Sequence, residues 1–351
     1  MTTTRDDPHD LEAWYRSIPA GASAVYAKAC AETRCAAGFY NRNVHVTYRG
    51  MPVNVRIPVP EADQMDHRQW PEPSILTTIA AHVPQAPRLY FESTDPVYQI
   101  QEYIDGTALH ILAPRGQPVP DQVPGDVARL FAQLRRIPPA DLPDTAEGLD
   151  DDPQRFARRL WNTTRHAYTT RRDQYARLFR RLGVPHDPFE PLDRAWTLLN
   201  ARPFRLLHCD LHRRNMIIRP SGDTVFLDWE LALYGDPLAD VAIHLHKMTY
   251  THTERQHFLR QWTAAEPQAA TPDWEHDLQI YLTHETLKGA VLDAVRYAKV
   301  FAEHSRTPAD EHTLVESLTR KLAAAAPFWN IEPPQHTQVE AALRDRPCLP
   351  Q

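Results

Sequence analysis

The sequence has 351 residues, of which 42% are hydrophobic and 24% are charged. Both fractions are close to the average of globular proteins, so the chain can bury a large apolar core, and disorder of the whole chain is excluded. The net charge is −6, and no dense run of lysine and arginine stands out. A dedicated nucleic-acid-binding protein carries a basic surface, so this composition argues against that class.

The N-terminus and the cysteines indicate a soluble, cytoplasmic protein. The first ten residues contain no apolar stretch typical of a signal peptide, and no run of 18 apolar residues occurs in the chain. Four cysteines in a chain of this length are too few and too scattered for a disulfide framework. We therefore expect neither membrane insertion nor a disulfide-stabilised fold.

The first sixty residues predict a helix followed by a β-hairpin. The helix is expected over 10–34, with a break near Pro19. Two segments that alternate apolar and polar residues, 43–48 and 53–57, flank a short Arg-Gly turn. Alternation on both sides of a glycine-containing turn is typical of a β-hairpin.

The next forty residues predict one more helix and two more strands. A proline-marked start at Trp70 opens a helical segment that runs to Ile79. Two further alternating segments follow, at 88–92 and 97–104. Residues 35–104 are therefore expected to be strand-rich, with one helix.

Beyond residue 105 the pattern becomes helical, with a 3.6-residue period in five segments: 122–136, 153–182, 190–199, 238–262 and 274–304. One β-rich island, 203–235, interrupts them, while 139–152 and the tail after Pro333 resemble loops. The order of elements predicts an α+β fold with two lobes and a cleft between them. We expect four parts: an N-terminal extension (1–34), a nucleotide-binding lobe (35–104), a catalytic and acceptor-binding lobe (105–332) and a tail (333–351).

The β-rich island contains a polar motif whose residue types suit phosphoryl transfer. His208 and Asp210 are followed by Asn215, and an apolar strand then ends at Asp228. In phosphoryl transfer one carboxylate accepts or orients the proton of the attacking hydroxyl, while an asparagine and a second carboxylate hold Mg²⁺ on the phosphates. Two short strands would bring these groups to one edge of the cleft.

This motif resembles that of the aminoglycoside phosphotransferase and choline kinase superfamily, the small-molecule relatives of protein kinases. The segment 235–242, Gly-Asp-Pro-Leu-Ala-Asp-Val-Ala, is similar to the family's segment after the metal-binding aspartate. The resemblance covers about residues 30–300 and implies a protein-kinase-like fold. It also implies roles for five residues: catalytic base or hydroxyl-orienting group (Asp210), Mg²⁺ ligands (Asn215 and Asp228), support of the catalytic loop (His208) and a structural role (Asp240).

The motif departs from the family at one position and has one alternative interpretation. Cys209 stands where the family often has glycine, which leaves the other positions intact. A zinc site is the alternative interpretation, with ligands from 208–212, but zinc sites usually draw on two separated clusters and no second cluster follows. His244 and His246 are two residues apart on a predicted helix, so they do not share a face.

The N-terminal lobe carries weaker similarities that imply ATP or GTP as the phosphoryl donor. The segment 37–44 resembles the family's nucleotide-covering loop, with Gly38 and Asn41 in matching places, although an ordinary turn is the alternative. Arg56 stands where kinases place a phosphate-binding lysine, and Glu72 is its candidate partner. A solvated strand arginine and an acidic residue that favours a helix start are the alternatives.

The segment 101–106 resembles the connector between the lobes, whose backbone usually hydrogen-bonds adenine. This similarity implies three nucleotide neighbours: Glu102, Tyr103 and Ile104.

The sequence indicates the acceptor of the phosphoryl group less clearly than the donor. The segment 273–293 holds five acidic residues and one lysine, and a negative field there would attract a cationic substrate such as an aminoglycoside. Glu285 falls on the apolar stripe of its predicted helix, so it either pairs with a core arginine or faces a substrate pocket. Trp229 and Glu230, which follow the metal-binding aspartate, are weaker acceptor-site candidates.

Three functions remain open at this point. The first is Mg²⁺-dependent phosphorylation of an antibiotic or other hydroxylated natural product, for resistance, self-protection or biosynthesis. The second is a metabolic kinase for choline, a sugar or an amino alcohol. The third is a nucleotide-binding module without turnover, which the intact motif argues against.

Protein kinase activity is disfavoured, because no Ala-Pro-Glu segment follows Asp228 and Trp-Glu replaces Phe-Gly after it. The expected partners are a nucleoside triphosphate and a small-molecule hydroxyl acceptor, with no nucleic acid and no membrane. The chain is expected to be a monomer or a homodimer.

Overall fold

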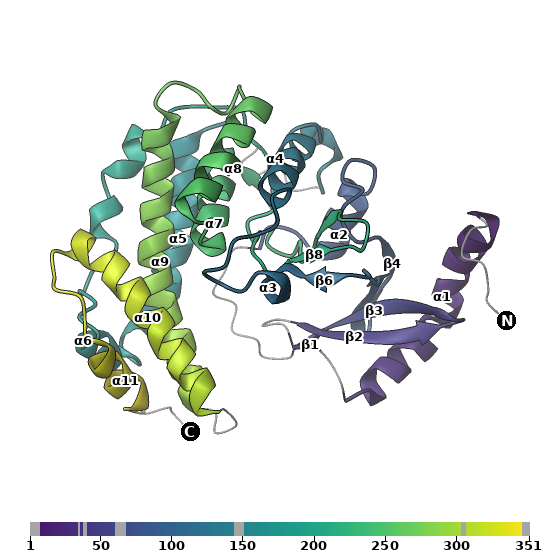
Figure 1. Cartoon of the computed structure of the whole chain (residues 1–351), viewed down its shortest axis with the longest axis horizontal. Coiled ribbons are helices and arrows are strands. Elements are labelled where there is room, and N and C mark those ends of the chain that lie inside the picture. Colours follow the sequence, from purple (N-terminus) through teal and green to yellow (C-terminus); the bar gives the residue numbers. More distant parts are fainter. Residues whose placement is uncertain are drawn as a thin grey trace.

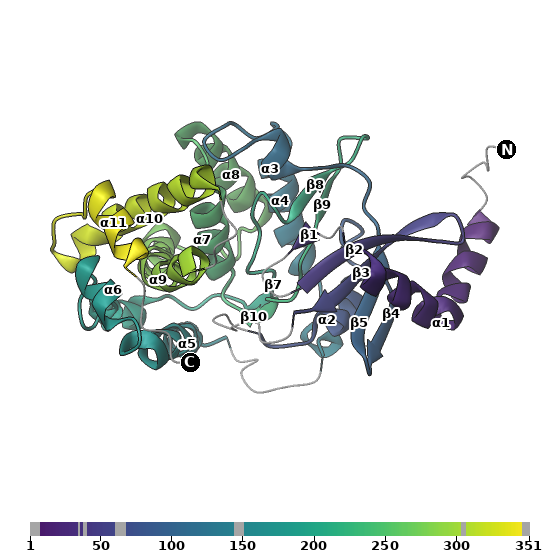
Figure 2. The same cartoon turned by 90° about the horizontal axis from the view of Figure 1, so that it is seen from below.

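The computed structural model describes residues 8–33, 36–37, 41–59, 68–143, 151–302 and 307–345. They form a small lobe built on an antiparallel sheet and a larger, mainly helical lobe (Figure 1). The same two lobes lie side by side in the view turned by 90° (Figure 2). The α+β, two-lobed fold expected from the sequence is confirmed, while the exact boundaries of its four parts stay a prediction.

The sheet of the small lobe has the strand order β1-β2-β3-β5-β4. The expected hairpin is present, and its register places Val44 opposite Val55 and Tyr48 opposite Met51. Arg49 and Gly50 between them both have positive φ, 47° and 81°, as a two-residue type I′ turn requires. The bounds of the strands are Ala36–Ala37 (β1), Asn41–Tyr48 (β2), Met51–Pro58 (β3), Leu89–Thr94 (β4) and Val97–Glu102 (β5).

Helix α1 (Pro8–Ala31) covers one face of this sheet. Its buried side chains Trp14, Ile18, Ala22 and Val25 recur every three or four residues and pack on the sheet. The break expected near Pro19 is wrong, because the helix continues through this proline. Burial of the apolar stripe outweighs the lost backbone hydrogen bond.

Helix α2 (Glu72–Ile79) connects the two lobes. It contacts β4, yet its buried residues Ile75, Leu76 and Ile79 belong to the apolar core of the large lobe. Motion of one lobe relative to the other would therefore have to carry or repack α2.

The large lobe is built from helices around two small groups of strands (Figure 1). The helices are α3 (Leu109–Leu112), α4 (Val123–Leu134), α5 (Pro153–Arg172), α6 (Ala176–Arg181), α7 (Pro237–Met248), α8 (His252–Ala265), α9 (Trp274–Ala302), α10 (Pro308–Trp329) and α11 (His336–Arg344). The strands are β6 (Thr107–Ala108), β8 (Met216–Ile218) and β9 (Thr224–Phe226) in one sheet, and β7 (Arg205–Leu207) with β10 (Leu233–Gly235) in the other.

Three of the predicted helical segments are interrupted. The segment 153–182 is divided between α5 and α6 by a turn at residues 173–175. Residues 190–199 form short 3₁₀ turns, because prolines in this region interrupt regular α-helical bonding. The segment 238–262 is split between α7 and α8. Thr249 adopts a left-handed backbone conformation, and Thr251 caps the N-terminus of α8 together with Glu254.

The end of the chain differs from the prediction. Helix α10 was not predicted, and the tail, expected to be a loop, contains α11. Val339, Ala342 and Leu343 of α11 are buried against α6, α9 and α10, so packing rather than local signals stabilises this helix.

Among the described residues, no helix combines the length and the apolar character needed to cross a bilayer. Cys30 and Cys209 are free thiols.

Candidate active site

Two loops carry the predicted motif, and backbone contacts hold them together. The 208–215 loop follows β7, and the β8–β9 hairpin leads to Asp228. The amide of Leu227 donates to the carbonyl of Asn215 at 2.8 Å. Asn215 and Asp228 therefore leave neighbouring strands at the same end of the hairpin, as the sequence pattern predicts.

His208 fastens the 208–215 loop to the residue before Asp228. Its Nε2 donates to the carbonyl of Leu227 at 3.1 Å, since a carbonyl can only accept, and its Nδ1 accepts from the amide of Asp210 at 3.3 Å. Burial lowers the pKa of His208 to about 4, so the ring is neutral at physiological pH. A neutral ring with one donor and one acceptor fits both contacts.

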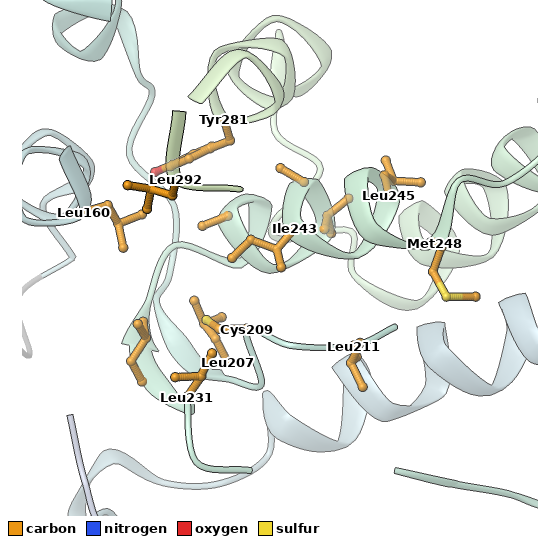
Figure 3. Packing of buried hydrophobic residues seen from close by; sticks show 14 of the residues in the cluster. Leu160, Leu207, Cys209, Leu211, Leu231, Ile243, Leu245, Met248, Tyr281 and Leu292 are labelled. Atoms are coloured by element: carbon orange, nitrogen blue, oxygen red, sulfur yellow. The ribbon is translucent and has the colours of Figure 1, made fainter. Parts of the chain in front are cut away.

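Cys209 and Asp228 both adopt left-handed backbone conformations, with φ of 61° and 66°. For a residue with a side chain this region costs about 1–2 kcal/mol. Asp240 offsets part of that cost, because its carboxylate accepts from the amides of His208 at 2.7 Å and Cys209 at 2.9 Å. The thiol of Cys209 packs beneath α7, which explains how cysteine replaces the glycine common in the family (Figure 3).

Asp240 lies at the beginning of α7, with only 1% of its surface exposed. Burial raises its pKa to about 6, although its two backbone hydrogen bonds favour the ionised form. It contacts only the backbone of the 208–215 loop in these bonds, which fits the structural role implied by the resemblance.

Asp210 is held by three side chains. Asn215 Nδ2 donates to its Oδ2 at 2.9 Å, Lys247 Nζ contacts its Oδ1, and His212 Nε2 lies 3.6 Å from Oδ1. Burial alone would raise the pKa of Asp210, but Lys247 and then His212 outweigh burial and hold the pKa below its usual value. The carboxylate is therefore ionised at neutral pH, ready to accept a hydrogen bond from a hydroxyl group.

Asn215 and Asp228 have the oxygen atoms that a Mg²⁺ ion prefers. Because Asn215 Nδ2 donates to Asp210, its Oδ1 is the atom left to face a metal. Asp228 keeps 27% of its side chain exposed, and one carboxylate oxygen contacts Arg56. An amide oxygen and a partly exposed carboxylate on linked loops fit a Mg²⁺ ion that retains several waters.

Arg56 on β3 is buried among carboxylates. Its Nε lies 2.8 Å from Glu72 Oε2, and its Nη2 contacts Asp228 and lies 3.1 Å from Glu230. Burial opposes the charged form of Arg56, but these carboxylates outweigh it and raise its pKa. The two residues paired in the sequence analysis, Arg56 and Glu72, are thus in contact.

Glu72 also connects α2 to the loop of Asp228, because its Oε1 accepts from the amide of Trp229 at 3.0 Å. Burial raises the pKa of Glu72, and Arg56 opposes that rise.

Glu230 lies with residues of the small lobe. Its Oε2 accepts from Asn41 Nδ2 at 2.7 Å and lies 3.1 Å from both Arg56 and Arg68. Burial and the nearby charge of Asp228 raise its pKa to about 7. Glu230 thereby joins Asn41 of the expected nucleotide-covering loop to the loop of Asp228.

The other predicted nucleotide neighbours lie at the lobe connector. Glu102 donates its amide to the carbonyl of Arg88 at 2.8 Å, and its side chain pairs with Arg219 at 3.1 Å. Tyr103 stacks edge-on against His45, and Ile104 is buried. The amide of Glu102 therefore already has a backbone partner within the small lobe. Gly38 lies outside the described residues.

The acceptor-site candidates Trp229 and Glu285 both have partners inside the protein. Trp229 is fully buried, its Nε1 donates to the carbonyl of Phe226 at 3.0 Å and its ring packs on His208, so it cannot contact an acceptor. Glu285 pairs with Lys288 at 2.6 Å and with His284 at 3.3 Å, not with an arginine. Lys288 and His284 overcome burial and lower the pKa of Glu285.

The acidic field expected on α9 is largely neutralised within the protein. Asp277 contacts Arg202 and Asp293 contacts Lys321, so these carboxylates, like Glu285, have internal cationic partners. Asp273 and Glu275 remain exposed, at the N-terminal end of α9.

Two residues that contact carboxylates of the site, Lys247 and Arg68, were not predicted from the sequence. Lys247 is seven residues after Asp240, a spacing that returns to nearly the same helix face two turns later, and this was the available signal. Arg68 lies in a proline-rich connection without periodicity, so its contact with Glu230 depends on the tertiary structure. Within the described residues, no group of three His, Cys, Asp or Glu side chains is arranged to hold a metal.

A comparison with protein-family models matches residues 32–327 to the phosphotransferase enzyme family. The chain belongs to this family. It is accordingly a phosphotransferase that acts on hydroxyl groups of small molecules, and the resemblance stated from the sequence is confirmed. A search of curated proteins finds no match.

Solved structures with the same fold include several small-molecule kinases. A choline/ethanolamine kinase family protein from Mesorhizobium loti has a TM-score of 0.53 at 14% identity, with 92% of this chain and 99% of that chain covered. A choline kinase from Streptococcus pneumoniae has a TM-score of 0.53 at 15% identity, with 84% and 92% covered. A macrolide 2′-phosphotransferase from Brachybacterium faecium has a TM-score of 0.51 at 17% identity, with 86% and 92% covered. These similarities show the fold of the phosphotransferase.

Proposed function

We propose that this phosphotransferase moves the γ-phosphate of ATP or GTP to a hydroxyl group of a small molecule, in a reaction that depends on Mg²⁺. The observation that carries the proposal is the arrangement of Asp210, Asn215 and Asp228 on two loops fastened to each other by backbone contacts. We assign catalysis to Asp210 and metal binding to Asn215 and Asp228. His208 and Asp240 support the loop.

Asp210 would act by orienting the acceptor hydroxyl. The hydroxyl oxygen forms a bond to the γ-phosphorus, the bond from phosphorus to the β–γ bridging oxygen breaks, and the hydroxyl proton passes to Asp210 and then to solvent. Because Lys247 keeps the pKa of Asp210 low, this carboxylate accepts the proton late, as the loose transition state of phosphoryl transfer requires. A Mg²⁺ ion held by Asn215 and Asp228 would neutralise charge on the phosphates.

The nucleotide would bind between the small lobe and the metal loop. Arg56, anchored by Glu72, supplies positive charge to the phosphates, and Asn41 covers them from the start of β2. Gly38 belongs to the same covering loop by resemblance. The connector residues Glu102, Tyr103 and Ile104 would lie beside the base.

The acceptor we propose is a hydroxylated natural product, such as an antibiotic, that carries few positive charges. Three acids of α9 that favoured a polycationic aminoglycoside are occupied by internal cations, while Lys247 places a positive charge beside Asp210. A macrolide 2′-phosphotransferase has the same fold, which supports this proposal. A kinase for choline, a sugar or an amino alcohol is the alternative.

The decisive experiment incubates the protein with Mg²⁺, ATP or GTP, and a panel of aminoglycosides, macrolides, nucleosides, sugars and choline. Intact-mass spectrometry then looks for a product heavier by one phosphoryl group, with Asp210→Asn as the blank. A product absent from the blank supports the reaction and identifies donor and acceptor. An aminoglycoside as the preferred acceptor would contradict the acceptor class, and product formed equally by the blank would contradict the role of Asp210.

A further inference from the structure

Helix α7 contacts the 208–215 loop at two points on one face. Asp240, in its first turn, accepts the amides of His208 and Cys209, and Lys247, near its end, contacts the carboxylate of Asp210. The spacing of seven residues from Asp240 to Lys247 corresponds to almost two full turns, so both side chains project from the same side. Figure 3 shows the loop residues Cys209 and Leu211 running along α7.

The two oxygens of Asp210 have different partners. Asn215 Nδ2 donates to Oδ2 at 2.9 Å, and Lys247 Nζ contacts Oδ1. A carboxylate held at both oxygens cannot rotate about its Cβ–Cγ bond without losing both contacts. His212, 3.6 Å from Oδ1, does not replace the ammonium, because burial lowers the pKa of His212 and favours its neutral form.

The type of cationic side chain at position 247 also affects how Asp210 is held. Only five of the 39 basic residues are lysine, and one of them is at this position. An ammonium is a compact charge that can bind one carboxylate oxygen, whereas the planar fork of arginine favours bidentate contact with both oxygens. Arginine at position 247 would therefore compete with Asn215 for Oδ2.

The ion pair between Lys247 and Asp210 does not lie in the protein core. The side chain of Lys247 is 31% exposed and that of Asp210 is 14% exposed, so the pair lies at the wall of a site open to solvent. A cation in the core would instead be enclosed, as Arg202 is, with no exposed side-chain surface.

We propose that Lys247 is a positioning residue for phosphoryl transfer: together with Asn215 it fixes the orientation of the Asp210 carboxylate toward the incoming hydroxyl. The proposal rests on the proposed function, because the orientation matters only if Asp210 receives the hydroxyl. Nothing in this role requires Lys247 to contact the nucleotide. Its loss should lower kcat and leave nucleotide affinity unchanged.

The kinetic test compares Lys247→Met, Lys247→Arg and Lys247→Ala with wild type, using the acceptor identified above or the hydrolysis of Mg²⁺-bound ATP or GTP by water. Lys247→Met should lower kcat by about 10- to 100-fold, as expected for a lost orienting group, with the nucleotide KM within about twofold. Ethylammonium should restore part of the activity of Lys247→Ala, and Lys247→Arg should stay impaired. A kcat for Lys247→Met within twofold of wild type, or full activity of Lys247→Arg, would overturn the proposal.

Lys321→Met is the matched control, because Lys321 also pairs with a buried carboxylate, Asp293, but lies on α10 and does not contact Asp210. Its kcat should equal that of wild type. Thermal unfolding of each variant separates loss of fold from loss of orientation. If Lys321→Met lost as much kcat as Lys247→Met, the effect would be general and the proposal would fail.

A structural readout separates this proposal from the proposed function. Crystal structures of wild type and Lys247→Met should differ at Asp210. In wild type the Asp210 carboxylate should contact Asn215, and in Lys247→Met this contact should be lost. This comparison needs no turnover, so it remains decisive if the protein phosphorylates nothing on the panel. An Asp210 carboxylate in the same orientation in both structures would refute the positioning role.

Discussion

Asp228 contacts the guanidinium of Arg56 while its backbone adopts φ of 66°, so this carboxylate is held both by its neighbours and by its own conformation. Arg56 compensates the negative charge of Asp228 in this structure, and under the proposed function a metal and phosphates would enter beside it. The same carboxylate would then be shared between Arg56 and Mg²⁺.

Asp228→Asn tests the metal role. The amide keeps the size of the side chain but removes the charge that Mg²⁺ needs, so Mg²⁺-dependent nucleotide affinity should fall on the order of tenfold or more. Calorimetric titration of the nucleotide with and without Mg²⁺ measures this change. Equal affinity of variant and wild type in the presence of Mg²⁺ would exclude Asp228 as a ligand.

The motif residues could be named from the sequence because their spacing is local. Asp210 and Asn215 belong to one loop, and Asp228 ends a hairpin strand that pairs with the residues after Asn215. Lys247 and Glu230 act through contacts with residues far apart in the chain, so sequence spacing could not assign their partners.

At the scale of elements, α1 is part of the core of the small lobe. Ile18 is fully buried between the helix and the sheet. Ile18→Ala should therefore reduce the free energy of unfolding by about 2–5 kcal/mol, through lost burial and an internal cavity. Urea denaturation measures the effect.

The control on the same helix is Arg16→Ala. Arg16 pairs with Glu12, but both side chains are largely exposed, at 80% and 68%. Its effect should stay within about 0.5 kcal/mol. Equal effects of the two substitutions would show that α1 does not pack on the sheet in solution.

Helix α7 holds the 208–215 loop through a third residue, His244, which is fully buried. Its Nδ1 lies 3.1 Å from the carbonyl of Leu211, and its Nε2 lies 3.0 Å from the hydroxyl of Tyr250. Burial lowers the pKa of His244 to about 3, against an ordinary value of 6.5.

The folded state therefore disfavours protonation of His244. The contribution of neutral His244 to the free energy of unfolding is therefore fully present above pH 6.5. This contribution is lost as the pH falls toward 3. Relative to His244→Gln, wild type should lose about 3 kcal/mol of unfolding free energy between pH 7.5 and pH 4. Urea denaturation of both proteins at several pH values measures the difference, and parallel pH dependences would contradict a buried, neutral His244.

At the scale of the whole molecule, Glu230 joins the two lobes at the proposed nucleotide site. It belongs to the large lobe, while Asn41 and Arg56 belong to the small lobe, and all three meet at one carboxylate oxygen. Helix α2 provides another connection through Glu72 and Trp229.

Glu230→Gln should therefore weaken nucleotide binding several-fold, because Asn41 and Arg56 lose the charge that orders them. Equilibrium nucleotide titration measures the effect, with Glu316→Gln on the exposed face of α10 as control. An unchanged dissociation constant for Glu230→Gln would show that the contact does not organise the site.

The sequence by itself determined the order of most elements and the identity of the motif, because alternation, helical periodicity and loop spacing are local properties. The two-residue turn at Arg49 and Gly50 and the pair Asn215 and Asp228 are examples. Tertiary structure decided what depends on distant partners. It kept α1 continuous through Pro19, stabilised α11 by burial, enclosed Trp229 and paired the acids of α9 with cations. It also brought Lys247 to Asp210, since burial and ion pairing depend on which surfaces meet, and no local pattern encodes that meeting.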